Sequence, residues 1–251
     1  MLLFSVRFIK KSYFCGTILK TKNMAKKKAQ QDDNLQELES ALTKTEHFIE
    51  ENQKPITYAV GAIVLIVIAY LGFTKFYLQP REQEAQSQMF MAESYFEKDS
   101  FNLAINGDGN YLGFLDIMDD YGMTKSANLA KYYTGISYLY LEQYEDALDY
   151  LNNFDTDDLL LGPVTEGARG DAELELGNTD AALKHYRKAY TMNENELTSP
   201  VYMMKAANLL ESMDEPEDAL AIYKEIKEKY PDSNEGRNIE KYISRVEIKL
   251  G

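Results

Sequence analysis

Three oxygen-bearing side chains alternate along a glycine-rich segment in the pattern of a calcium-binding loop. Asn106, Asp108 and Asn110 occupy every second position, and this spacing lets carboxylate and amide oxygens surround one ion. The glycine that such a loop needs next is Tyr111, and the closing glutamate is Ile117. We therefore interpret the segment as a glycine-rich loop between two helices, and the sequence predicts no metal site there.

A second acidic group consists of Asp155, Asp157 and Asp158, which also have the oxygen atoms that a cation needs. Short acidic side chains commonly accept hydrogen bonds from the first backbone N–H groups of a helix. We therefore predict that this group caps and solvates a connection between two helices rather than binding a metal.

Few side chains are available as nucleophiles or bases. The chain contains one cysteine, Cys15, and two histidines, His47 and His185, so it forms neither a disulfide framework nor a Cys/His metal site by itself. The histidines fall on opposite sides of the apolar segment described below, and His185 occupies an exposed-type position of a helix. Without a triad or a phosphate-binding glycine loop, we predict no enzyme activity, no cofactor and no catalytic residue.

Charge is distributed unevenly along the 251 residues, which carry 41 Asp and Glu against 27 Lys and Arg, a net charge of −14. Residues 1–80 hold 11 basic and 7 acidic side chains, a net charge of +4, and the remainder hold 16 and 34, a net charge of −18. Since so acidic a surface repels phosphate groups, we predict that the protein does not bind nucleic acid.

One segment has the length and composition of a membrane span. Residues 56–73 read ITYAVGAIVLIVIAYLGF, 18 residues without a charge, and a helix of this length covers about 27 Å. Lys75 and the aromatic residues Tyr70, Phe76 and Tyr77 suit the interface beyond it. The sequence predicts a transmembrane helix over 55–78; the alternative is a buried helix of a soluble protein.

Basic residues set the predicted orientation of this span. Lysines 26–28, Lys44 and Lys54 precede it, whereas Lys75 and Arg81 are the nearest basic residues after it. Because the flank richer in Lys and Arg stays in the cytoplasm, we expect a cytoplasmic N-terminus and an exported C-terminal part. In a bacterium with two membranes, this means a single-pass inner-membrane protein whose larger part is periplasmic.

The segments before the span are predicted to be a basic cytoplasmic tail over 1–33 and an amphipathic juxtamembrane helix over 34–54. The sequence from Met24, with Ala25 and three lysines after it, resembles the start of a membrane protein. Residues 1–23 are therefore interpreted either as untranslated, because the start of the gene was assigned too far upstream, or as a dispensable basic tail. The juxtamembrane helix has an acidic polar face, which favours a solvated spacer, a partner helix or self-association over lipid binding.

The exported part repeats itself. Similar stretches begin at Asn128, Pro163 and Pro200, which are 35 and 37 residues apart, and each predicts two antiparallel helices. Small residues on the first helix face small residues on the second, and larger side chains fill the space between neighbouring pairs. The small residues are Gly135, Gly170 and Ala207 on first helices, and Ala147, Ala182 and Ala219 on second helices; the larger ones include Tyr186 and Tyr223.

This pattern is similar to the tetratricopeptide repeat, a helix-turn-helix unit of roughly 34 residues. The most specific fragments are 176–178 (LGN), 181–183 (AAL) and 230–231 (YP). Lys131 and Glu166 depart from the pattern because they occupy the place of the aromatic residue of a first helix, and 214–216 (DEP) replaces the glycine turn.

The predicted fold is all-α: a tetratricopeptide-repeat α-solenoid of about three to four helix-turn-helix repeats with a capping helix, preceded by one transmembrane helix. A degenerate first repeat is predicted over 79–126, further repeats over 127–235 and the capping helix over 236–251.

The inner faces of the first helices are the predicted site, a groove for peptides or partner proteins. The selected residues are Leu129, Tyr132, Ile136, Leu139, Asp171, Leu174, Met204 and Asn208. Some chaperone-binding repeat domains use lysines and asparagines there to hold a C-terminal carboxylate. Only Asn208, with Lys205 nearby, matches that pattern, so binding of a carboxylate tail is not predicted.

The order of parts over residues 24–251 resembles the YfgM-type ancillary subunit of the Sec translocon. This resemblance implies an anchored protein beside the SecYEG channel that contacts periplasmic chaperones or emerging chains. One alternative is an envelope scaffold or adaptor that links inner-membrane and outer-membrane complexes. Another is a membrane-bound regulator that acts through its cytoplasmic tail.

Overall fold

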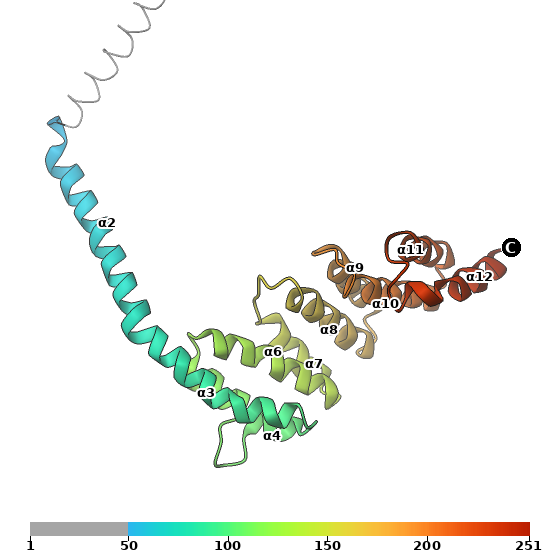
Figure 1. The fold of residues 1–251 in the computed structure, drawn as a ribbon, viewed down its shortest axis with the longest axis horizontal. Helices are drawn as coiled ribbons and strands as arrows, with labels where there is room; N and C mark the ends of the chain where they lie inside the picture. The colour runs from blue at the N-terminus through green and yellow to red at the C-terminus, as the bar shows by residue number, and fades with distance from the viewer. Residues whose placement is uncertain (1–49) are drawn as a thin grey trace, which may run out of the picture. The chain divides into compact units, whose positions relative to one another are not determined.

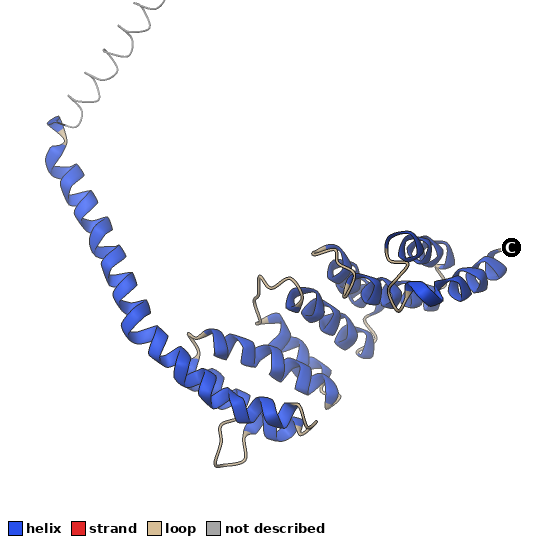
Figure 2. Ribbon diagram, viewed as in Figure 1, coloured by secondary structure: helices blue, strands red, loops and turns tan. Residues whose placement is uncertain are grey.

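The structure is a computed structural model that describes residues 50–251. Within that range every regular element is helical (Figure 2), which confirms the all-α prediction. The predicted tail over 1–33 and nearly all of the predicted juxtamembrane helix over 34–54 lie outside the described residues.

The helices follow one another along the chain (Figure 1). Their bounds are α2 Gln53–Phe73, a π-helical segment Thr74–Leu78, α3 Gln79–Phe96, α4 Phe101–Asn106, α5 Phe114–Tyr121, α6 Lys125–Tyr140, α7 Tyr144–Asn152, α8 Leu161–Glu175, α9 Thr179–Thr191, α10 Ser199–Ser212, α11 Pro216–Lys229, a short 3-10 helix Gly236–Asn238 and α12 Ile239–Leu250.

The described residues divide into two units, with the boundary between Leu71 and Gly72. The helical run Gln53–Phe96 contains an 18-residue window with a mean hydropathy of 2.3, none of which is buried. By length and composition this run is able to cross a membrane. Pro55 lies in the first turn of α2, where its missing N–H removes no intrahelical bond.

In the second unit, α6 packs on α7, α8 on α9 and α10 on α11, so each of the three predicted repeats folds as a helical hairpin. Neighbouring hairpins pack through α7 against α8 and α9 against α10, and α12 packs on α11. This is the arrangement of a repeat solenoid, in which each unit covers the apolar face of the next.

The first helix of every repeat ends in the same way, with one residue in the left-handed conformation. These residues are Asp99, Glu142, Gly177 and Asp214, with φ values of 56°, 61°, 82° and 61°. The residue after each one donates its N–H to a carbonyl five residues back, which closes the helix as a Schellman motif. The four N···O distances are 2.9 Å for Ser100 to Tyr95, 2.9 Å for Gln143 to Tyr138, 2.8 Å for Asn178 to Glu173 and 2.9 Å for Glu215 to Leu210.

This shared ending shows that α3 is built as the first helix of a repeat, followed by a second helix that is interrupted between α4 and α5. It also shows that Asp214 adopts the conformation that glycine adopts at 177, although an L side chain is disfavoured there.

Close contacts inside each hairpin explain why the first helices carry small residues. A Cβ atom on Gly170 would lie 2.6 Å from Cε1 of Tyr186, and a Cβ atom on Gly135 would lie 2.6 Å from Cγ of Leu151. Neither position has room for a larger residue. The predicted facing of Gly135 with Ala147 and of Gly170 with Ala182 is confirmed, because the same Cβ atoms would lie 3.2 and 3.3 Å from the carbonyl oxygens of these alanines. Tyr186, predicted to fill space between neighbouring hairpins, also packs inside its own.

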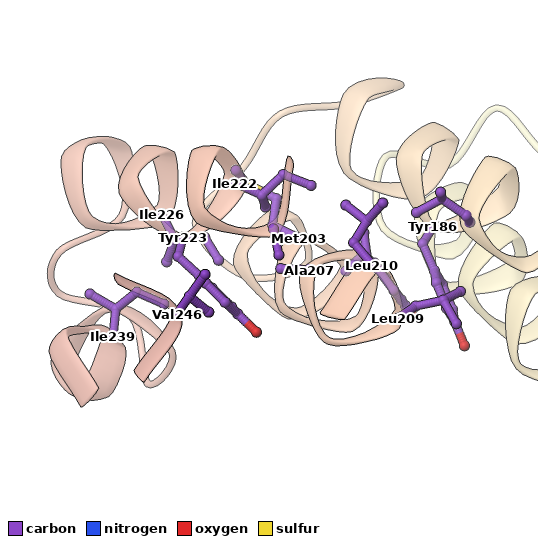
Figure 3. Packing of buried hydrophobic residues seen from close by; sticks show 14 of the residues in the cluster. Tyr186, Met203, Ala207, Leu209, Leu210, Ile222, Tyr223, Ile226, Ile239 and Val246 are labelled. Atoms are coloured by element: carbon purple, nitrogen blue, oxygen red, sulfur yellow. The ribbon is translucent and has the colours of Figure 1, made fainter. Parts of the chain in front are cut away.

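The buried side chains form two clusters in the second unit. One joins α3, α4, α5 and α6 and includes Met89, Phe114 and Ile117. The other extends from α9 to α12, and Figure 3 shows Tyr186, Leu210, Tyr223 and Val246 among its members.

The two acidic groups in loops serve local structure. Asp108 Oδ1 accepts hydrogen bonds from the backbone N–H of Tyr111 and Asn110 at 2.8 and 2.9 Å, and Tyr95 Oη donates to Asp108 Oδ2 at 2.8 Å. These hydrogen bonds, led by that from Tyr111, lower the pKa of Asp108. Asp158 Oδ1 accepts from the N–H groups of Leu160 and Leu161, each at 2.8 Å, which confirms that this aspartate caps the start of α8.

Candidate functional site

The eight predicted groove residues lie on three first helices. Leu129, Tyr132, Ile136 and Leu139 lie on α6, Asp171 and Leu174 on α8, and Met204 and Asn208 on α10. Asn208 is exposed and the other seven are half-buried, so all eight are accessible in part. We call these positions, together with the polar residues described next, the first-helix face.

Equivalent positions on α8 and α10 carry hydrogen-bonding groups that tyrosines hold in place. Tyr186 Oη donates to Asp171 Oδ1 at 2.7 Å, and Tyr223 Oη lies 2.8 Å from Asn208 Oδ1. Both tyrosines come from the second helix of the same repeat and are almost fully buried. On α6 the equivalent position is Ile136, which lies one residue after Gly135, so the polar part of the face begins at α8.

Lys205 on α10 connects two repeats. Its Nζ lies 2.6 Å from both carboxylate oxygens of Asp171, and the same atom lies 5.7 Å from the ring centroid of Tyr186 and 5.9 Å from that of Tyr202. The ammonium charge is therefore balanced by a carboxylate of the protein, which argues against Lys205 holding the carboxylate of a ligand.

The first-helix face continues onto the capping helix. Tyr223 Oη also lies 2.6 Å from Glu211 Oε1, and Arg245 of α12 forms an ion pair with Glu211. The Arg245 guanidinium lies 4.9 Å from the ring centroid of Tyr242. The two acids and two bases on this face are thus paired with each other, and Asn208 lies exposed between the pairs.

Burial keeps the tyrosine hydroxyls protonated. Burial first, and then the hydrogen bond to Asp171, raises the pKa of Tyr186 far above its usual value, and burial with the hydrogen bond to Glu211 raises that of Tyr223. Both hydroxyls are therefore neutral at physiological pH: Tyr186 donates to Asp171, and the single proton of Tyr223 goes to the closer Glu211 carboxylate.

A buried carboxylate in α8 was not predicted as a special residue. Glu166 is 3% exposed, and three basic side chains surround it: Arg169 Nη1 donates to Oε1, Lys188 Nζ lies 2.8 Å from Oε1, and His185 Nδ1 lies 2.9 Å from Oε2. Burial raises the pKa of Glu166, but the hydrogen bonds from His185 and Lys188 and the charge of Arg169 outweigh it and lower the pKa to about 2.

The interpretation of His185 as exposed was wrong, because its side chain is only 26% exposed and packs against Glu166. The Arg169 guanidinium also donates to the carbonyl oxygens of Leu151 and Phe154 at the end of α7. The cluster of Glu166, Arg169, His185 and Lys188 thus connects the α6–α7 hairpin to the α8–α9 hairpin. The sequence signal for it was Glu166 itself, a charged residue where the repeat pattern expects an aromatic one.

Comparisons with known proteins agree with the repeat fold. Residues 202–233, which comprise most of α10, all of α11 and the turn that follows, match the family model of the tetratricopeptide repeat. No curated protein matches the chain.

Two solved structures are similar in fold. The crystal structure of MamA has a TM-score of 0.47 at 16% identity, covering 63% of this chain and 94% of that one. A crystal structure of nearly identical TPR-like repeats of a Podosopora anserina kinesin light chain has a TM-score of 0.52 at 12% identity, covering 68% of this chain and 88% of that one. The match to the repeat model and the likeness to the kinesin light chain repeats show a TPR-like solenoid fold, and repeats of this type serve as protein–protein interaction modules.

Proposed function

We propose that this protein is a membrane-anchored interaction module that binds peptides or partner proteins on its first-helix face, as an accessory of the Sec translocon or of chaperone handover in the periplasm. The observation that carries the binding role is the row of positioned polar groups on α8, α10 and α12. The apolar, unburied window in the helical run Gln53–Phe96 supports the anchor.

Recognition on this face depends on groups that are fixed before a ligand arrives. Tyr186 donates to Asp171, and the Asp171–Lys205 pair holds α8 against α10, so little entropy of these side chains is lost on binding. An exposed amide both donates and accepts, which suits the backbone of an extended or helical peptide. Half-buried Leu129, Tyr132 and Met204 add apolar contact area for its side chains.

The anchor makes modest affinity sufficient. A membrane tether converts binding at the channel exit into an event with an effective concentration of about millimolar for a short linker. A weak and adaptable face is then able to engage many different emerging chains. This property suits an accessory of translocation better than a permanent subunit interface.

Crosslinking in cells tests the binding face. A photo-crosslinking amino acid at Asn208 is expected to capture translocon subunits, periplasmic chaperones or emerging chains, which mass spectrometry identifies. The matched control places the same amino acid at Lys184, an exposed residue of the second helix α9, where we expect few adducts. Equal capture from both positions would contradict a role of the first-helix face. Capture of lipoproteins or wall enzymes would favour the envelope scaffold instead.

A topology reporter tests the anchor and its orientation. Alkaline phosphatase fused after Gly251 is expected to be active, because the enzyme matures only after export and the basic flank keeps the N-terminus inside. Deleting 56–73 from the same fusion should abolish its activity and release it from the membrane fraction. An active reporter without that segment would show that another signal drives export.

A further inference from the structure

A cavity lies in the repeat unit where the start of α3 meets the connection between α5 and α6. Its volume is about 250 Å³. One arginine, two aspartates and two tyrosines are among the residues that line it. The lining residues are Tyr77, Leu78, Arg81, Asp119, Asp120, Tyr121, Gly122, Met123 and Thr124.

Arg81 is held at this cavity by aromatic rings and by one hydrogen bond. Its guanidinium carbon lies 5.8 Å from the ring centroid of Tyr77 and 5.1 Å from that of Tyr121, and Nη2 donates to the carbonyl oxygen of Asp120. A guanidinium has five N–H donors, so its planar group keeps donors for an anion such as a phosphodiester.

The position of these residues along the chain places them at the level of lipid headgroups. This step rests on the proposed membrane anchor. The charge-free stretch ends at Phe73, and Tyr77, whose ring stacks on Phe73 at 5.1 Å, lies four residues further on in a continuous helical run. Tyr77 and Arg81 lie four and eight residues beyond Phe73, which is about 6 and 12 Å at the α-helical rise and less where the run is π-helical. Since each headgroup layer is about 5–7 Å thick, Tyr77 falls within that layer. The backbone of Arg81 falls about 5 Å beyond it, and its guanidinium reaches back to the Tyr77 ring.

The charges that line the cavity select among headgroups. Arg81 suits a phosphate, whereas Asp119 and Asp120 suit a cation and would repel a headgroup that is only anionic. The rings of Tyr77 and Tyr121 are occupied by the Arg81 guanidinium, so the carboxylates are the groups that remain for a ligand cation. A headgroup with both an anion and a cation complements Arg81 and the two carboxylates together.

We propose that this cavity binds the headgroup of a zwitterionic phospholipid of the phosphatidylethanolamine type, with the phosphate at Arg81 and the ammonium at Asp119 and Asp120. A primary ammonium is able to donate hydrogen bonds to both carboxylates. A bound lipid would join the start of the repeat unit to the membrane surface at a defined point.

Nanodiscs that contain equal amounts of phosphatidylethanolamine and phosphatidylglycerol provide the test. The full chain is inserted, released in the gas phase and analysed by native mass spectrometry for the lipids it retains. We expect the wild type to retain phosphatidylethanolamine about tenfold above its share, since the contact is a charge-assisted hydrogen bond. Arg81→Gln should abolish this enrichment, and Lys98→Gln, which removes an exposed charge at the end of α3, should preserve it.

A second variant distinguishes loss of lipid binding from misfolding. It is needed because Arg81 also donates to the carbonyl of Asp120, so that Arg81→Gln removes a contact of the fold as well. Asp119 is exposed, and we expect Asp119→Asn to reduce the enrichment severalfold without altering the circular dichroism spectrum. The matched control is Asp157→Asn, an exposed aspartate of the α7–α8 connection. Unchanged enrichment in both Arg81→Gln and Asp119→Asn would overturn the proposal.

Two further outcomes distinguish a lipid ligand from a free phosphodiester, and failure of the headgroup site from failure of the membrane anchor. Soluble glycerophosphoethanolamine at millimolar concentration should not displace the lipid, and efficient displacement would overturn a lipid ligand in favour of a free phosphodiester. If the full chain enters nanodiscs without enrichment, only the headgroup site fails. If the full chain does not enter nanodiscs at all, the proposed anchor fails and the headgroup site fails with it.

Discussion

Replacing Glu166 with glutamine is expected to destabilise the folded protein by about 3–5 kcal/mol, the usual cost of removing one partner from a buried ion pair. The substitution leaves Arg169, whose side chain is 13% exposed, without its carboxylate, and it also removes the partner of Lys188 and His185. Urea unfolding of the full chain in detergent micelles, followed by circular dichroism, measures the change in the free energy of unfolding.

A matched variant distinguishes this effect from a general loss of negative charge. Glu175→Gln removes an exposed carboxylate from the end of the same helix, and a surface change of this kind is expected to stay within about 0.5 kcal/mol. Equal destabilisation by both variants would mean that the cluster around Glu166 contributes nothing beyond surface electrostatics.

The same cluster predicts a pH dependence with a definite sign. The pKa of Glu166 is lowered from 4.5 to about 2 in the folded state, so the folded state favours the ionised form. Its contribution to stability is complete above about pH 4.5 and disappears as the pH falls toward 2. The difference in stability between the wild type and Glu166→Gln should therefore narrow over that interval, and a constant difference would contradict the assignment.

Replacing Tyr186 with alanine is expected to cost about 3–5 kcal/mol, as truncation of a large buried aromatic side chain does. The ring is 2% exposed and fills the space that Gly170 leaves open on α8, with a Cβ atom at that glycine only 2.6 Å away. Its removal opens a cavity between α8 and α9 and releases Asp171 from its hydroxyl donor. Urea unfolding of the full chain in detergent micelles measures this loss.

Two controls separate packing from hydrogen bonding. Tyr186→Phe keeps the ring and removes only the donor to the Asp171 carboxylate, which should cost about 1.5–3 kcal/mol, less than loss of the ring. Tyr140→Ala truncates a ring that is 64% exposed and should have little effect on unfolding. If Tyr186→Phe were as damaging as Tyr186→Ala, the hydroxyl rather than the ring would hold the two helices together.

Much of the fold was predictable because its determinants are local and repeated. The helical spacing of apolar residues predicted the hairpins, and small residues such as Gly170 and Ala182 on facing helices predicted how closely the two helices of a repeat approach each other. The degenerate first repeat over 79–126 was predicted from residues at repeat positions, and its bounds stay a prediction. The residues of the first-helix face were chosen by position within the repeat, and all eight are accessible in part.

The partners of charged residues were not predictable in this way. Glu166 is separated by 19 and 22 residues from His185 and Lys188, and Asp171 by 34 residues from Lys205. The spacing of apolar residues along a helix indicates which face a residue occupies, but it does not indicate which residue of another helix lies opposite. That depends on how neighbouring hairpins pack.

Side-chain type at short, regular spacing was sufficient to predict the all-helical class, the repeating hairpins and the apolar segment. The packing of the helices, in contrast, buries Glu166 among three basic side chains, pairs Lys205 with Asp171 and brings Arg81 against Tyr77 and Tyr121 beside a cavity. These contacts could not be predicted because electrostatic interactions act through space. Their strength is set by distance and burial, which exist only after helices remote in the chain have packed together.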